Sequence, residues 1–178
     1  LLEPALKLND ASRLICEEGP LSSLLADLAT QKLDLDLADR PLDTSFHVRG
    51  YNHLLGECGL SFFATQEVAA SYRANFPASL EGAPMLMPAA GTERGMGLKR
   101  WFERYKIKPD IKVECADTAL IEAFGLSGAG IFCAPTVIEQ QMTRQYGVEV
   151  IGRMDDIRER FYAISLERRV SHAGVLAV

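Results

Sequence analysis

The hydrophobic pattern of this chain changes its period repeatedly, and this feature constrains the fold most. Leu21, Leu24 and Leu28 follow the i, i+3, i+7 spacing that places apolar side chains on one face of a helix. Residues 33–37 then alternate leucine with aspartate, the period-two pattern of a strand with one buried face. Because residues 13–16 predict a short strand before the helix, this region is expected to form one βαβ unit.

The same alternation continues along the rest of the chain. Strands are expected at residues 60–64, 84–87, 111–115, 131–134, 148–151 and 161–166, and helices at 1–8, 68–76, 98–105, 120–124 and 138–146. Thr136 and Glu139 have the spacing of a capping box at the start of the last helix, and Gly147 is placed to end it. Repeated alternation of this kind predicts an α/β fold with mainly parallel sheets that helices cover on both faces.

Composition excludes several classes of protein. The 178 residues are 48% hydrophobic, which is enough to bury a core, but no apolar run approaches the roughly 18 residues that a membrane-spanning helix needs. The net charge of −5 opposes binding to a phosphate backbone, so the chain is not expected to grip nucleic acid. The chain begins at Leu1 without a recognisable signal peptide, so we expect a cytoplasmic piece of a longer protein.

Five short segments carry a resemblance to a known family. They are residues 18–19, 33–39, 56–57, 116–121 and 128–135. In this order and spacing the chain resembles the effector-binding domain of the LysR-type transcriptional regulators. The resemblance implies two Rossmann-like lobes joined by two crossover strands, a fold like that of the type 2 periplasmic binding proteins. It also implies that the winged helix-turn-helix and the first strand of the domain are absent from this chain.

The resemblance also implies how the chain is divided and what it binds. Lobe I is expected at residues 1–55 plus 132–178 and lobe II at residues 56–131, with a small effector or an ion in the cleft between them. A homodimer or tetramer is expected, and promoter DNA is contacted only through the missing N-terminal domain. The strings at residues 51–59 and 145–153 resemble the NhaR-type branch, activators of sodium/proton antiporter genes. That branch implies a response to sodium or alkaline pH.

The resemblance further implies a set of residues that line the effector cleft. They are Pro20, Leu21, Ser22, Asp39, Arg40, Asn52, His53, Pro88, Ala89, Asp117, Thr118, Phe132, Ala134 and Pro135. Asp39 and Asp117 are candidate sodium ligands because hard cations prefer oxygen, although Asp117 has the alternative role of a helix N-cap. His53 is either a structural histidine or a pH sensor, since imidazole titrates near neutrality.

Other functions find less support in the sequence. Motifs for nucleophilic catalysis, phosphate binding and zinc proteolysis are absent, so neither an enzyme nor a cofactor is expected. The four cysteines lack ligand spacing and are interpreted as core thiols, with a redox pair of Cys58 and Cys133 as the alternative. The basic residues within 99–108 are interpreted as the solvated face of an amphipathic helix rather than a nucleic-acid site. A periplasmic solute-binding protein of the same shape and a cysteine-based redox-sensing regulator remain alternative functions.

Overall fold

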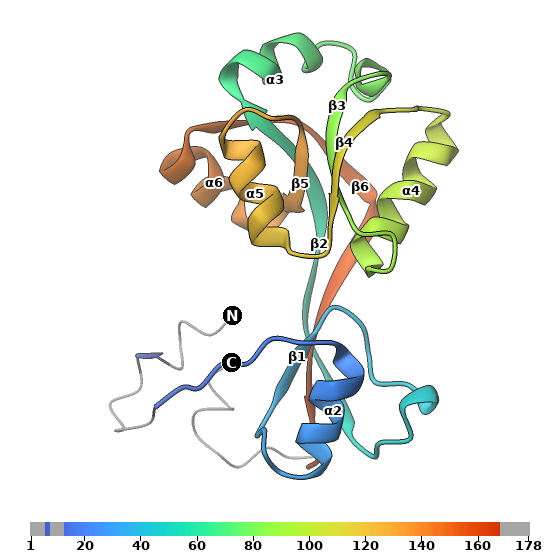
Figure 1. Cartoon of the computed structure of the whole chain (residues 1–178), viewed down its shortest axis with the longest axis vertical. Helices are drawn as coiled ribbons and strands as arrows, with labels where there is room; N and C mark the ends of the chain where they lie inside the picture. Colours follow the sequence, from blue (N-terminus) through green and yellow to red (C-terminus); the bar gives the residue numbers. More distant parts are fainter. Residues whose placement is uncertain (1–5, 8–12, 168–178) are drawn as a thin grey trace. The chain divides into compact units, whose positions relative to one another are not determined.

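The computed structural model describes residues 6–7 and 13–167, and the chain divides into two compact units. Within the described residues, unit 1 takes in the chain up to Gly56 and again from Arg160, and unit 2 is Glu57–Glu159. Two long strands, β2 (Tyr51–Thr65) and β6 (Val148–Ser165), carry the chain from one unit to the other (Figure 1).

The second boundary between the units differs from the expected one. β5 (Phe132–Pro135) pairs antiparallel with residues 60–63 of β2, which keeps the chain after Phe132 in unit 2. Residues 132–159, expected in lobe I, lie in unit 2, and the chain leaves that unit only after Glu159. The bounds of the units and of the expected lobes differ because the apolar pattern of residues 131–134 identifies a strand without identifying the strand that it pairs with. The first boundary falls after Gly56 instead of after Leu55.

Unit 1 is built on one helix and a short strand. α2 (Leu21–Ala29) buries Leu25 and Leu28, which pack with Ile164 of β6. β1 (Asp36–Ala38) pairs antiparallel with residues 162–164 of β6, and a 3-10 turn, η1, follows at Thr44–Phe46.

The strand expected at residues 13–16 is not formed, because this segment is exposed and pairs with no strand among the described residues. The helix expected at residues 1–8 lies largely outside the described residues.

Unit 2 holds most of the helices among the described residues. Its elements are α3 (Gln66–Tyr72), η2 (Ala78–Leu80), β3 (Pro84–Pro88), α4 (Glu93–Tyr105), β4 (Asp110–Cys115), α5 (Thr118–Leu126), β5, η3 (Thr136–Ile138) and α6 (Glu139–Tyr146). β3 and β4 are parallel, and α4 and α5 lie on opposite sides of them (Figure 1). The pairs β1–β6 and β2–β5 are antiparallel, so the prediction of mainly parallel sheets was wrong.

Two local predictions near the C-terminal end also need correction. The separate strands expected at residues 148–151 and 161–166 are one strand, β6, which continues through a charged stretch. The capping box fails because Ile138 precedes α6 without a side-chain cap, while the carboxylate of Glu139 accepts hydrogen bonds from Arg153 at 2.8 and 2.6 Å and from Ser61. Gly147 ends α6 in the left-handed conformation, as predicted.

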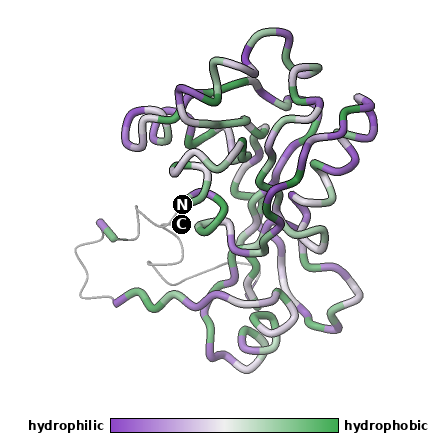
Figure 2. Tube along the Cα trace, turned by 45° about the horizontal axis from the view of Figure 1, so that its top comes forward, coloured by the Kyte–Doolittle hydropathy of each residue, from purple (hydrophilic) through white to green (hydrophobic). Residues whose placement is uncertain are grey.

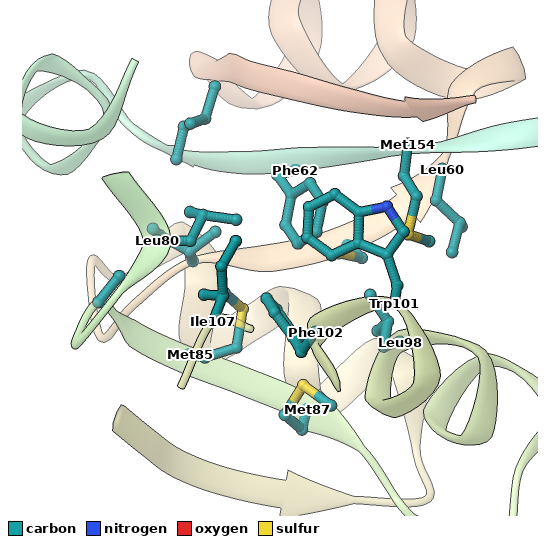
Figure 3. Packing of buried hydrophobic residues seen from close by; sticks show 14 of the residues in the cluster. Leu60, Phe62, Leu80, Met85, Met87, Leu98, Trp101, Phe102, Ile107 and Met154 are labelled. Atoms are coloured by element: carbon teal, nitrogen blue, oxygen red, sulfur yellow. The ribbon is translucent and has the colours of Figure 1, made fainter. Parts of the chain in front are cut away.

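Aromatic side chains form the centre of the core of unit 2. The ring centroids of Phe62 and Trp101 are 5.3 Å apart, and those of Phe62 and Phe76 are 5.6 Å apart. Figure 3 shows Phe62 and Trp101 packed with Leu98 and Met154, which are likewise buried. Hydrophobic residues follow the central strands, and hydrophilic residues gather on the outer turns (Figure 2). This core holds α4 against β2.

Candidate functional site

The carboxyl ends of the parallel strands β3 and β4 meet at one edge of unit 2. Pro88 is paired with Cys115, and the N–H of Ala89 donates to the carbonyl of Cys115 at 2.8 Å. Asp117 and Thr118 then begin α5. The structure therefore brings together four of the predicted residues, Pro88, Ala89, Asp117 and Thr118, at the kind of edge where open α/β sheets bind ligands.

The first turn of α4 is hydrogen-bonded to the same edge. Thr92 caps the helix by accepting a 3.0 Å hydrogen bond from the N–H of Gly95, and its hydroxyl donates to the carbonyl of Ala89 at 2.7 Å. A β-carbon built on Gly95 would lie 2.2 Å from the carbonyl oxygen of Ala89. Only glycine allows the helix to approach the end of β3 this closely.

Asp117 has a structural role in this arrangement. Its Oδ1 accepts hydrogen bonds from the N–H groups of Ala119 at 2.9 Å and Leu120 at 3.2 Å, so it is the N-cap of α5. The other candidate sodium ligand, Asp39, is exposed after β1 in unit 1. Within the described part of the chain, no three His, Cys, Asp or Glu side chains form a group that could hold a metal ion.

The remaining predicted residues of unit 1 lie at the ends of its elements. Pro20 precedes α2 as its N-cap residue, and Leu21 and Ser22 form the first turn. Arg40 is exposed, and its guanidinium lies 5.5 Å from the centroid of the Phe46 ring. None of these positions is buried.

Asn52 and His53 make defined polar contacts within unit 1. The side-chain amide of Asn52 accepts from the N–H of Leu42 at 2.7 Å and donates to its carbonyl at 2.9 Å, which holds the loop after β1. Nε2 of His53 lies 2.9 Å from Oγ of Ser165, and that hydroxyl donates to the carbonyl of Glu167 at 2.7 Å. Because serine has one proton to donate, Nε2 of His53 is the donor, and both neutral and protonated imidazole satisfy this geometry.

Two predicted residues on β5 belong to the core instead of an open surface. Phe132 and Ala134 are fully buried, and Phe132 stacks on Phe63 with ring centroids 5.6 Å apart. Their side chains pack in the hydrophobic cluster beneath α5. Pro135 is half-buried at the end of the strand.

Unit 2 also holds a largely buried group of ionisable residues that the sequence patterns did not reveal. Nε of Arg94 donates to Oε1 of Glu159 at 2.5 Å, and Nη2 donates to Oε2 at 3.1 Å. The two side chains retain only 18% and 12% of their exposure, respectively. Arg94 shares a helix face with Leu98 and Trp101, at spacings of four and seven residues, and this pattern could have indicated that it points inward.

Burial and charge shift the protonation of this group. Burial disfavours the charged form of Arg94, but the hydrogen bond and the charge of Glu159 more than compensate, and the pKa of Arg94 is raised. Burial also raises the pKa of Glu122, which the charge of Arg94 partly opposes. The pKa of Cys133 is raised well above its ordinary value, chiefly by burial, so this cysteine remains a thiol at neutral pH. A protonated, buried thiol does not favour the proposed redox pair with Cys58.

A buried carboxyl group in unit 1 was also missed. Asp36 is 4% exposed on β1, and its Oδ2 has no hydrogen-bond partner in the described residues. Burial raises the pKa of Asp36, while a hydrogen bond from the backbone of Leu37 opposes the shift. A buried charge that lacks a full set of partners reduces the stability of the fold.

We expect Asp36→Asn to increase the free energy of unfolding at pH 7.5 by about 1 kcal/mol, because it removes this charge. The folded state binds a proton at Asp36 more readily than the unfolded state does, so the wild type gains stability as the pH falls through the raised pKa. The advantage of the variant should therefore shrink toward pH 4.5. Urea denaturation at both pH values tests this, with the exposed Asp34→Asn as control. A variant less stable than the wild type at both would show that the carboxylate is stabilised.

Comparisons with known proteins explain this arrangement. The model of the LysR substrate binding domain matches residues 5–178. The chain belongs to this family. It is 32% identical over 175 residues to the transcriptional activator protein NhaR of Escherichia coli, an alignment that covers 98% of this chain and 57% of NhaR. The LysR-family chain thus spans little more than half the length of this relative.

Solved structures of LysR-type regulators share the fold. The regulatory domain of the HypT M206Q mutant from Salmonella typhimurium superposes with a TM-score of 0.75 at 16% identity, covering 99% of this chain and 87% of that one. The DarR regulator of Vibrio fischeri in complex with DNA gives a TM-score of 0.73 at 17% identity, covering 98% and 60%. The chain therefore has the two-lobed α/β fold of the type 2 periplasmic binding proteins. Its family consists of transcriptional regulators, not enzymes, and no helix among its described residues is long and apolar enough to cross a membrane.

Proposed function

We propose that this LysR-family domain is the effector-sensing and oligomerisation part of a cytoplasmic transcriptional activator that responds to sodium or alkaline pH. The observation that carries the proposal is the 32% identity to NhaR over 98% of the chain. In this proposal, promoter DNA is bound by an N-terminal domain outside the chain. The DNA complex of DarR supports this assignment over a solute-binding protein.

Units 1 and 2 are proposed as the two lobes, and each contributes residues to effector recognition. In unit 2 these are Pro88, Ala89 and Thr118, which the structure gathers at the edge of β3 and β4. Unit 1 contributes His53, whose hydrogen bond to Ser165 connects β2 to β6. An effector acts through such groups only to the extent that it binds one arrangement of the lobes more tightly than another.

The proposed homodimer draws on exposed apolar residues. The family resemblance implies an interface in which residues 92–105 and 111–115 of one subunit face residues 1–8 and 13–16 of its partner. Ile111 on β4 is 52% exposed and Tyr105 on α4 is 45% exposed. Ile15, in the segment expected to lie opposite them, is 71% exposed. In a twofold interface each contact occurs twice, so burial of such side chains would remove apolar surface from water at two symmetric contacts.

The sensing proposal is tested on the full-length regulator by promoter binding. Sodium is titrated at fixed pH with potassium keeping the ionic strength constant, and pH is titrated at fixed sodium. We expect at least one titration to change the affinity or the footprint. If His53 is the sensor, His53→Gln abolishes the pH response, because glutamine keeps a donor but cannot titrate.

Asp117→Asn separates an ion site from the helix cap. Asparagine caps a helix about as well as aspartate, so the variant removes the charge while α5 remains capped. Loss of the sodium response in this variant would support Asp117 as an ion ligand. An unchanged response would leave it as an N-cap only, and a regulator indifferent to both titrations would refute the sensing proposal.

A further inference from the structure

A groove between α4 and β6 of unit 2 is lined mainly by positively charged side chains, whereas the chain as a whole is negatively charged. Its lining residues are Arg100, Trp101, Arg104, Asp156, Ile157 and Arg158, and its volume is about 360 Å³. Three guanidinium groups and one carboxylate leave two positive charges uncompensated, although the chain as a whole has a net charge of −5. The groove lies along the C-terminal half of α4, whereas Thr92 and Arg94 are at its N-terminal end.

The single carboxylate of the groove is fully engaged. Oδ1 of Asp156 accepts from the indole N–H of Trp101 at 3.0 Å, and Oδ2 accepts from Arg104 at 3.1 Å and from the Tyr105 hydroxyl at 3.4 Å. Asp156 therefore holds Arg104 in place and neutralises only that cation.

The other two arginines remain available. Neither Arg100 nor Arg158 has a hydrogen bond, ion pair or ring contact within residues 6–7 and 13–167. They come from different elements, α4 and β6, yet both line the groove. Like charges that line one groove repel one another, and an anion bound between them would reduce this repulsion.

The walls of the groove favour such an anion further. Trp101 is only 3% exposed and Ile157 is half-buried, so an apolar surface backs the guanidinium groups. The volume of about 360 Å³ lies at the small end of the range for ligand sites, which suits a small molecule better than a macromolecular surface.

We propose that the α4–β6 groove binds a small oxyanion, a phosphate- or carboxylate-bearing molecule, through Arg100, Arg104 and Arg158. The planar guanidinium fork matches both groups because it donates two parallel hydrogen bonds to two oxygens. Asp156 acts as a positioning residue for Arg104. The site uses none of the residues proposed above for effector recognition, so either proposal can fail without the other.

The test uses the one tryptophan of the chain as a reporter. Trp101 lines the groove and its indole N–H is bonded to Asp156, so the ¹H–¹⁵N signal of that group should respond to an occupant. Inorganic phosphate and succinate are titrated separately, with chloride keeping the ionic strength constant. We expect at least one to shift the signal with saturation, and the responding probe identifies the class of oxyanion.

Variants determine whether the arginines are responsible. Arg100→Gln and Arg158→Gln should each weaken binding about tenfold or more, the usual effect of losing one charge-assisted hydrogen bond. Lys99→Gln is the matched control, because it removes the same charge from α4 at an exposed position outside the groove lining. The two arginines lie on different elements, so a folding defect in one variant leaves the other informative.

Three results would overturn the proposal. The first is a shift that rises linearly without saturation for both probes. The second is a loss of affinity in Lys99→Gln as large as in the arginine variants, which would indicate only a general surface potential. The third is a response to a short DNA duplex but to neither small anion, which would assign the basic face of α4 to nucleic acid.

Discussion

Gly95→Ala is expected to lower the free energy of unfolding by about 3 kcal/mol, at the upper end of what overpacking costs. The added methyl group would lie 2.2 Å from the carbonyl oxygen of Ala89 and 2.8 Å from that of Pro88. Both obstacles are backbone atoms at the end of β3, so no rotation of a side chain relieves the contact. The first turn of α4 would have to move away from the edge that it shares with β3.

Gly97→Ala in the same helix is the control for this prediction. The nearest atom to its added methyl group would be Cγ2 of Ile157 at 3.6 Å, an ordinary contact. Alanine is the better helix former by about 0.5–1 kcal/mol, so this variant should be slightly more stable than the wild type. Urea denaturation of both variants measures the contrast. Equal stabilities for the two would mean that α4 is not pressed against β3 as the structure shows.

The sequence predicted the kind of fold because its signals are local. The apolar stripe of residues 21–28 became α2, and the run at residues 84–87 became β3, since helix and strand periods depend on neighbouring residues alone. The family resemblance supplied the two-lobed arrangement of those elements. Pairing was harder to predict, because β5 finds its partner in β2 about seventy residues earlier in the chain.

The charged middle of β6 shows why its length was missed. Arg153, Asp156 and Glu159 interrupt the apolar pattern, yet the strand continues through all three. Each of these side chains finds a counter-charge on a helix, with Arg153 bound to Glu139, Asp156 to Arg104 and Glu159 to Arg94. These partners are distant in sequence, so no window on β6 alone reveals them.

The pattern of strands and helices allowed some candidate residues to be placed at a common edge, but it did not reveal which side chains are buried or charged inside the units. Pro88, Ala89, Asp117 and Thr118 meet at one edge because strand ends and helix starts can be found from the pattern. The burial of Phe132 and Ala134 was not predicted, because a strand of small and apolar residues does not indicate which of its faces is covered. Arg94 and Asp36 were overlooked because charged residues are usually exposed, and these two are exceptions.

The ion pair of Arg94 and Glu159 should contribute strongly to the stability of unit 2. Arg94→Met should lower the free energy of unfolding by about 3 kcal/mol at pH 7, because it leaves the Glu159 carboxylate buried without a partner. It also removes the charge that partly opposes the burial-driven rise in the pKa of Glu122, so that pKa should rise further. The double variant Arg94→Met/Glu159→Leu should recover most of this loss, since it removes both charges and fills the space with apolar groups.

The exposed pair of Arg73 and Glu149 is the matched control for burial. Its nitrogen and oxygen are also 2.5 Å apart, but the side chains retain 52% and 33% of their exposure. Arg73→Met should therefore cost less than about 1 kcal/mol. Denaturation of Arg94→Met, of Glu159→Leu and of the double variant gives the coupling energy of the buried pair directly. A double variant as unstable as Arg94→Met would show that the arginine stabilises unit 2 through its packing, and that its charge is incidental.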